Sequence, residues 1–196
     1  TLIVFCSDNG FSCGHHGFWG KGNGTNPRSV YENSTTVPFI ASHPARIPAG
    51  SVSDAMMSAY DFMPTLLDYL DMADEIPEEQ NLPGRSFAPI WEGNAAEGPE
   101  IVVVYDEYGP VRLIRTREYK FVERFPDGPN ELWDLVNDPD ERENRIDDPE
   151  LAQVAAELKN EMTRWFAQYV DPDRDGLKVT KSATEDRINL RPEKMD

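Results

Sequence analysis

Five polar residues near the start of the chain have types and spacing suited to chemistry on a charged ester: Asp8, Asn9, His15, His16 and Lys21. The apolar run before them, residues 2–6, is rich in β-branched side chains and predicts a buried strand. In open α/β sheets, ligands bind beyond the carboxyl ends of the strands. A carboxylate and an amide oxygen are hard donors of the kind that Ca²⁺ and Mg²⁺ prefer. The sequence therefore predicts cation ligands, Asp8 and Asn9, directly after this strand.

The rest of this loop can supply a cationic group and a group that transfers a proton. Glycines interrupt the loop at positions 10, 14, 17, 20 and 22, and Lys21 and two histidines follow Asp8 within thirteen residues. A bound cation and a lysine together can neutralise charge on a tetrahedral oxyanion ester, while a histidine moves a proton. Taken singly, an Asp-Asn-Gly sequence is commonly a turn, and a lone lysine or histidine in a loop is commonly solvated. The complete set in one loop is harder to explain by turns alone.

Several further motifs follow this loop in a fixed order. The loop reads SDNG and then HGFWGKG, and Tyr31-Glu32 and VPFI at 37–40 come after it. Three later regions carry recognisable patterns: DFMPTLL at 61–67, LPGRSF at 82–87, and VRLIRT, YK, ELWDL and NDP between 111 and 139. Together these motifs closely resemble the C-terminal part of arylsulfatase-like sulfatases of the alkaline-phosphatase-like superfamily. The resemblance covers residues 1–170, and its specificity comes from several motifs agreeing in order.

This resemblance implies an α/β fold, namely the C-terminal portion of an alkaline-phosphatase-like sandwich with a small antiparallel sheet and a packed C-terminal helix. It also implies hydrolysis of a sulfate ester. Asp8 and Asn9 then match metal ligands for Ca²⁺, with Mg²⁺ or Mn²⁺ as alternatives, and Lys21 matches a lysine that binds a sulfate oxygen. His16 matches a catalytic histidine that contacts the sulfate or the leaving oxygen. His15 is expected to contact these groups rather than the substrate or the metal itself.

The nucleophile of that family has no cysteine counterpart in this chain. Related sulfatases oxidise the first residue of a C/S-x-P-x-R motif to formylglycine, and neither cysteine here begins such a motif. Cys6 and Cys13 stand outside any such pattern and are expected to be free thiols. The resemblance places formylglycine and two further metal-binding aspartates in an N-terminal half of the same enzyme. We therefore expect that missing half to be the partner of this chain, and the chain alone to be inactive.

Composition excludes some partners. The chain has 196 residues and a formal net charge of −17, from 19 basic and 36 acidic residues. Nucleic-acid backbones need a basic face, so no nucleic-acid partner is expected. No apolar run reaches the length of a membrane span. The sequence opens directly on a core strand, so we interpret its start as a cut; the family resemblance suggests periplasmic, secreted or lysosome-like export.

The pattern of elements predicts two subdomains and a tail. Residues 1–98 are expected to form the C-terminal part of the catalytic α/β domain. Residues 99–170 contain four closely spaced strand candidates and a helix that starts at Asp148-Pro149, which predicts an antiparallel sheet with a packed helix. Residues 171–196 form a polar tail.

Other polar residues have simpler explanations than a site. Asp61 precedes a predicted helix and is expected to cap it rather than bind a metal. His43 is expected to be structural. Asp106, Glu107 and Tyr108 could line the rim of a substrate pocket, but an exposed turn explains them as well.

Two other functions remain open at this point. One is a metal-dependent phosphonate monoester or phosphodiester hydrolase of the same superfamily, in which the same loop pattern occurs. The other is a non-catalytic binding module that keeps a relic of the loop.

Overall fold

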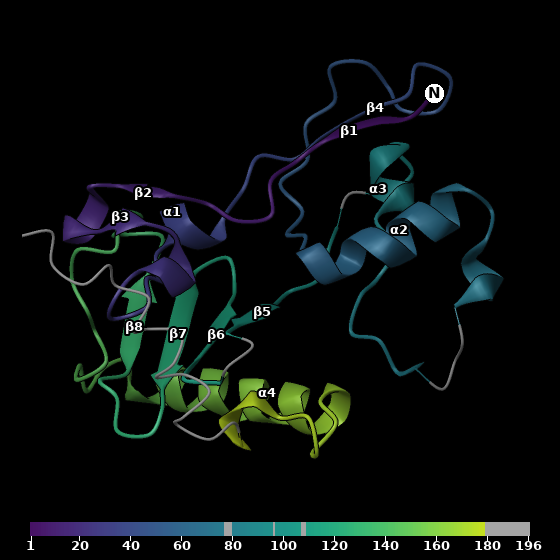
Figure 1. Cartoon of the computed structure of the whole chain (residues 1–196). Helices are drawn as coiled ribbons and strands as arrows, with labels where there is room; N and C mark the ends of the chain where they lie inside the picture. The colour runs from purple at the N-terminus through teal and green to yellow at the C-terminus, as the bar shows by residue number, and fades with distance from the viewer. Residues whose placement is uncertain (77–79, 96, 107–108, 179–196) are drawn as a thin grey trace, which may run out of the picture.

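The largest unit of the structure is a four-stranded antiparallel sheet with one long helix packed on it (Figure 1). The computed structural model describes residues 1–76, 80–95, 97–106 and 109–178. The strands pair in the order β5-β6-β7-β8 and are joined by turns, as expected for closely spaced strands without helices between them. Their bounds are β5 Val102–Tyr105, β6 Val111–Arg115, β7 Tyr119–Arg124 and β8 Glu131–Asp134. This confirms the predicted antiparallel sheet.

Helix α4 (Ala152–Tyr169) covers one face of this sheet, as Figure 1 shows. Apolar residues three or four apart give the helix one buried stripe. The buried members of the stripe are Leu158, Met162, Trp165 and Phe166. They pack against side chains from all four strands: Val103, Ile114, Phe121 and Leu132. The predicted packing of a C-terminal helix on the sheet is therefore confirmed.

The start of α4 differs from the prediction. Asp148 and Pro149 precede the helix and lie in a separate turn, and α4 begins at Ala152. The Asp148 carboxylate accepts the backbone N–H of Glu150 at 2.9 Å and also pairs with Arg145. The carboxylate therefore closes a local turn instead of capping the helix.

The opposite face of the sheet carries a second apolar cluster. Its buried members are Val111, Leu113, Val122, Trp133 and Leu135. Val30 and Tyr31 pack against them, directly before the short helix α1 (Glu32–Thr35). The hairpin of β2 (Ser12–Cys13) and β3 (Trp19–Gly20) lies beside α1 over this face (Figure 1). The sheet thus has α4 on one side and the polar N-terminal loop on the other.

A two-stranded ribbon, β1 (Ile3–Phe5) with β4 (Ile40–Ser42), extends away from the sheet. It lies near α2 (Phe62–Tyr69) and α3 (Ala88–Trp91), where Tyr69, Phe87 and Trp91 are buried. The prediction of a strand in 2–6 is confirmed, but the prediction that it is buried is wrong. Ile3 and Phe5 are 64% and 61% exposed. Among the described residues β1 pairs only with β4, so one face of the ribbon has no cover.

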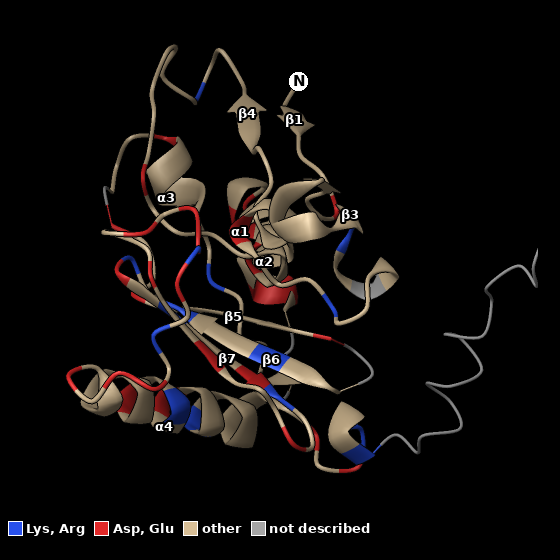
Figure 2. Ribbon diagram, turned by 90° about the vertical axis from the view of Figure 1, so that its left-hand side faces the viewer, with Lys and Arg blue, Asp and Glu red and all other residues tan. Residues whose placement is uncertain are grey.

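Charged residues are distributed over α4, the large sheet and the loops, whereas β1 and β4 carry none (Figure 2). No helix within the described ranges is both long enough and apolar enough to cross a membrane. Of the predicted polar tail, residues 171–178 are described and 179–196 lie outside the described residues. The division at residue 98 stays a prediction.

Candidate active site

The structure brings Asp8, Asn9 and Lys21 together. The Lys21 ammonium donates to Asn9 Oδ1 at 3.0 Å and lies 4.0 Å from Asp8 Oδ2. These residues are far enough apart in sequence that a turn alone would not join them. The β2–β3 hairpin, which pairs Ser12 with Gly20, reverses the chain and returns Lys21 to the end of β1. A lysine, a carboxylate and an amide oxygen therefore lie together; their binding of a cation and of sulfate stays a prediction.

All three side chains line one open pocket of about 330 Å³. Its far wall comes from the large sheet, through the end of β5 and the start of β6. Arg28 and Asp106 form an ion pair in this wall, and both side chains are largely buried. Asp106 thus lies on the pocket as well as in the turn after β5. The other two rim candidates, Glu107 and Tyr108, lie outside the described residues.

Three buried serines connect the loop to α1. The Ser34 hydroxyl is 2.9 Å from the hydroxyl of Ser12 and 2.8 Å from that of Ser29. The backbone N–H of Gly10 donates to Ser34 O at 3.1 Å. A Cβ on Gly10 would lie 2.2 Å from Asn33 O, so only glycine fits this approach. Sequence reasoning missed this group because serines in a loop carry no spacing signal.

His16 lies away from that pocket. Its ring stacks on Tyr31, with centroids 3.7 Å apart and planes at 6°, and Tyr31 packs on Trp133. His16 has a φ of 51°, in the left-handed region. Partial burial lowers the pKa of His16, and the charges of His15 and Lys120 act in the same direction, against smaller opposing effects of Asp138 and Asp140. Its role as a catalytic and substrate contact stays a prediction.

The structure gives Asp61, His43 and the cysteines structural explanations. Asp61 is buried, and its carboxylate accepts the backbone N–H groups of Ser58 at 2.7 Å and Arg85 at 2.8 Å. It makes no side-chain hydrogen bond to the first turn of α2, so the predicted cap of that helix is wrong; Asp61 closes the preceding turn instead. Burial raises the pKa of its carboxyl group. His43 Nδ1 forms a hydrogen bond with the Tyr69 hydroxyl. Cys6 and Cys13 are free thiols, as expected.

The donor atoms at the end of β1 fit a hard divalent cation in type. The Asp8 side chain is 82% exposed, which leaves its carboxylate open to a ligand, and Asn9 adds an amide oxygen. Calcium takes roughly six to eight oxygen ligands. Within the described ranges, no cluster of three or more His, Cys, Asp or Glu residues could hold a metal ion. These two residues can therefore supply only part of a coordination shell.

Comparison with known proteins identifies the family. A family model described as "N-sulphoglucosamine sulphohydrolase, C-terminal" matches residues 14–168. The chain belongs to this sulfatase family. An N-acetylglucosamine-6-O-sulfatase from Bacteroides thetaiotaomicron is 32% identical over 190 residues, which cover 89% of this chain and 32% of that protein. A Δ4,5-hexuronate-2-O-sulfatase of the same organism is 29% identical, over 91% of this chain and 37% of that protein.

Solved sulfatase structures confirm the predicted fold class. One, determined in complex with its substrate D-glucosamine-2-N,6-O-disulfate, has a TM-score of 0.73 at 32% identity. The match covers 89% of this chain and 35% of that one. A phosphonate monoester hydrolase of Agrobacterium radiobacter has a TM-score of 0.70 at 26% identity, over 87% of this chain and 36% of that one. The chain thus spans about a third of the length of the sulfatases that it matches.

Proposed function

We propose that this chain supplies the metal-binding and sulfate-binding side of a sulfatase that hydrolyses a sulfate ester. One observation carries the proposal: the Lys21 ammonium lies 3.0 Å from Asn9 Oδ1 and 4.0 Å from Asp8 Oδ2, in one open pocket. A sulfate ester reacts faster when charge on its oxygens is neutralised as the ester bond breaks. A fixed ammonium beside two cation ligands is suited to that task.

Asp8 and Asn9 would hold a divalent ion, which we propose to be Ca²⁺, with Mg²⁺ or Mn²⁺ as alternatives. When bound, such an ion neutralises charge on sulfate oxygens. Lys21 would bind one of those oxygens, because its side chain is half exposed and faces the pocket. His16 keeps its proposed role as a contact of the sulfate or leaving oxygen, although its ring is stacked on Tyr31 in this structure.

The remaining parts of the site must come from elsewhere. Formylglycine as the nucleophile, and further metal ligands, would belong to an N-terminal part of the same enzyme. Support comes from relatives about three times as long. The one C/S-x-P-x-R match in this sequence, residues 42–46, begins in β4 and does not line the pocket of Asp8, Asn9 and Lys21. We expect this chain alone to release no sulfate.

We propose a sulfated sugar as the substrate class. Two relatives are named for sulfated amino sugars or hexuronates. The pocket wall carries polar groups that suit a polyhydroxylated alcohol, namely Arg28 and Asp106. The competing activity is hydrolysis of phosphonate monoesters, because solved structures of two such hydrolases match with TM-scores of 0.70 and 0.71.

The experiment compares three preparations: the longer enzyme with its N-terminal part, the same enzyme with chelator, and this chain alone. Sulfate release is measured from a sulfated monosaccharide and an aryl sulfate, and ester hydrolysis from an aryl phosphonate. The proposal predicts metal-dependent sulfate release by the longer enzyme only. Sulfate release by this chain alone, or a higher kcat/KM for the phosphonate, would contradict it.

A further inference from the structure

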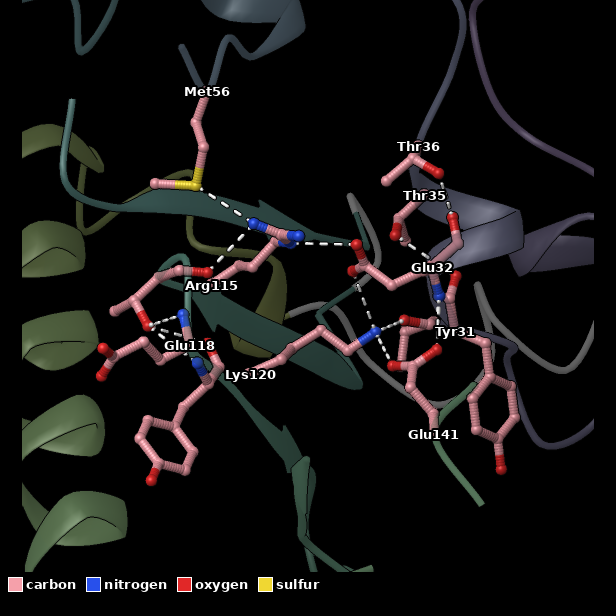
Figure 3. Close-up of polar contacts among 12 residues, drawn as sticks. Tyr31, Glu32, Thr35, Thr36, Met56, Arg115, Glu118, Lys120 and Glu141 are labelled. Carbon is pink, nitrogen blue, oxygen red and sulfur yellow. Dashed lines mark hydrogen bonds and ion pairs between the residues drawn. The ribbon is translucent and has the colours of Figure 1, made fainter. Parts of the chain in front are cut away.

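Four charged side chains meet beneath α1, where the large sheet contacts the N-terminal loop (Figure 3). The Lys120 side chain, from β7, is completely buried. Its ammonium donates to Val30 O at 2.9 Å, lies 3.3 Å from Glu32 Oε1 and pairs closely with Glu141. Arg115, from β6, binds the other Glu32 oxygen, with Nε 2.9 Å from Oε2. The cluster contains two cations and two carboxylates, so its charges balance.

Glu141 holds this cluster to the first turn of α1. Glu141 is 2% exposed, and its Oε2 accepts a hydrogen bond from the backbone N–H of Glu32 at 2.7 Å. Its φ of 54° lies in the left-handed region, which is unfavourable for a residue with a side chain. Burial raises the pKa of the Glu141 carboxyl group, and Lys120 opposes that rise. The chain therefore accepts both backbone strain and desolvation to keep this carboxylate here.

Stability alone is a weak reason for such a cluster. Well-packed apolar residues often stabilise a protein as much as a buried ion pair does. What charged groups add is a fixed geometry, because each hydrogen bond accepts only a narrow range of positions. The segment that they fix is α1, which has four residues and is too short to be stable as an isolated helix.

Helix α1 in turn contacts the loop that carries the candidate ligands. Ser34 O accepts the Gly10 N–H at 3.1 Å, and the Asn33 side-chain amide donates to Ser12 Oγ at 2.8 Å. Gly10 directly follows Asn9. Hydrogen bonds therefore join the buried ammonium in β7 to the start of α1, and join the end of α1 to Gly10, beside the proposed cation ligands.

We propose that Lys120 is a positioning residue, which fixes α1 through Val30 and Glu32 and so holds the Asp8–Asn9 loop in place for its cation. The effect on cation binding rests on the proposed function. The effect on the loop does not, because these hydrogen bonds involve no side-chain atom of Asp8 or Asn9.

The test uses the full-length enzyme with two variants. Glu32→Gln removes the shared carboxylate and leaves the Lys120–Glu141 pair intact. The double variant Lys120→Met with Glu141→Gln removes the pair while leaving no unpaired carboxylate from it. Lys159→Met is the matched control, because Lys159 makes an ion pair with Glu123 at 2.6 Å from the other side of the sheet and is half exposed.

Two readouts separate positioning from simple destabilisation. The first is hydrogen exchange of amides in residues 8–13 without metal, measured equally far below each variant's melting temperature. The second is the Ca²⁺ concentration that gives half of the maximal rise in melting temperature. We expect faster exchange at Gly10 in both variants and a rise of about tenfold in that concentration, as for other partners that orient metal ligands. Lys159→Met should change neither.

Unchanged exchange at Gly10 in either folded variant would overturn the positioning role. Failure of the proposed function has a different signature: the wild-type enzyme would show no Ca²⁺-dependent stabilisation, while exchange at Gly10 would still rise in both variants.

Discussion

Replacing Gly10 with alanine tests how closely α1 packs on the candidate ligand loop. A methyl group there would lie 2.2 Å from Asn33 O and 2.8 Å from Thr36 O. Carbon–oxygen contacts in proteins are about 3.3 Å or longer. Both oxygens belong to the backbone and cannot rotate away, so the loop and α1 must separate by about 1 Å.

The free energy of this separation has two parts. Overpacking at a well-packed site costs about 1–3 kcal/mol. The hydrogen bond from Gly10 N to Ser34 O is already 3.1 Å long, and its loss would cost about 0.5–1.5 kcal/mol. We therefore expect Gly10→Ala to lower the free energy of unfolding of this region by about 1.5–4.5 kcal/mol and to weaken Ca²⁺ binding.

Urea denaturation of the full-length enzyme, with and without Ca²⁺, measures both effects. Gly24→Ala is the matched control, because a methyl group there meets only Lys21 Cγ, at 4.0 Å, an ordinary contact. If Gly10→Ala and Gly24→Ala unfold at the same urea concentration, α1 does not pack on the loop as described.

Three further changes have defined outcomes. Met162→Ala, in the core between α4 and the sheet, should cost about 2–5 kcal/mol of stability in urea denaturation, and an unchanged midpoint would contradict the packing. Arg28→Met should lower kcat/KM for a sulfated sugar by about tenfold, because it removes hydrogen bonds to the sugar hydroxyl groups. It should leave kcat/KM for a small aryl sulfate unchanged. An equal fall in kcat/KM for both substrates would refute this role of Arg28. Hydrogen bonds from Asn137 lower the pKa of Asp134, so Asp134 stabilises the fold above its unfolded pKa. The difference in stability between wild type and Asp134→Ala should therefore shrink as pH falls below ~4, and a constant difference would exclude the effect.

The regular elements of the large sheet could be predicted from local patterns. Alternation and turns define the four strands, and residues 151–169 carry an apolar stripe that only a helix gathers on one face. The exposed face of β1 could not be predicted, because an apolar run looks the same whether one face or both are covered. The start of α4 was misplaced because Asp148 suits an isolated turn as well as a helix cap.

The candidate site was predictable only in part. Asp8 and Asn9 come just before the β2–β3 hairpin and Lys21 just after it, so their spacing carries the signal. Lys120 and Val30 are 90 residues apart, and a lysine in a strand is normally on the surface, so nothing local marks the buried cluster. The stack of His16 on Tyr31 likewise depends on how α1 meets the sheet.

The most direct test of the central claim is the kcat/KM of the full-length enzyme for a sulfate ester after Lys21→Met, beside Lys159→Met as a control for loss of a lysine. Removing one group that stabilises transition-state charge typically costs about 10²–10³ in rate. The account predicts a loss of that size for Lys21→Met, with an unchanged melting temperature and no loss for Lys159→Met. Equal kcat/KM for the two variants would contradict the assignment of Lys21 to the sulfate.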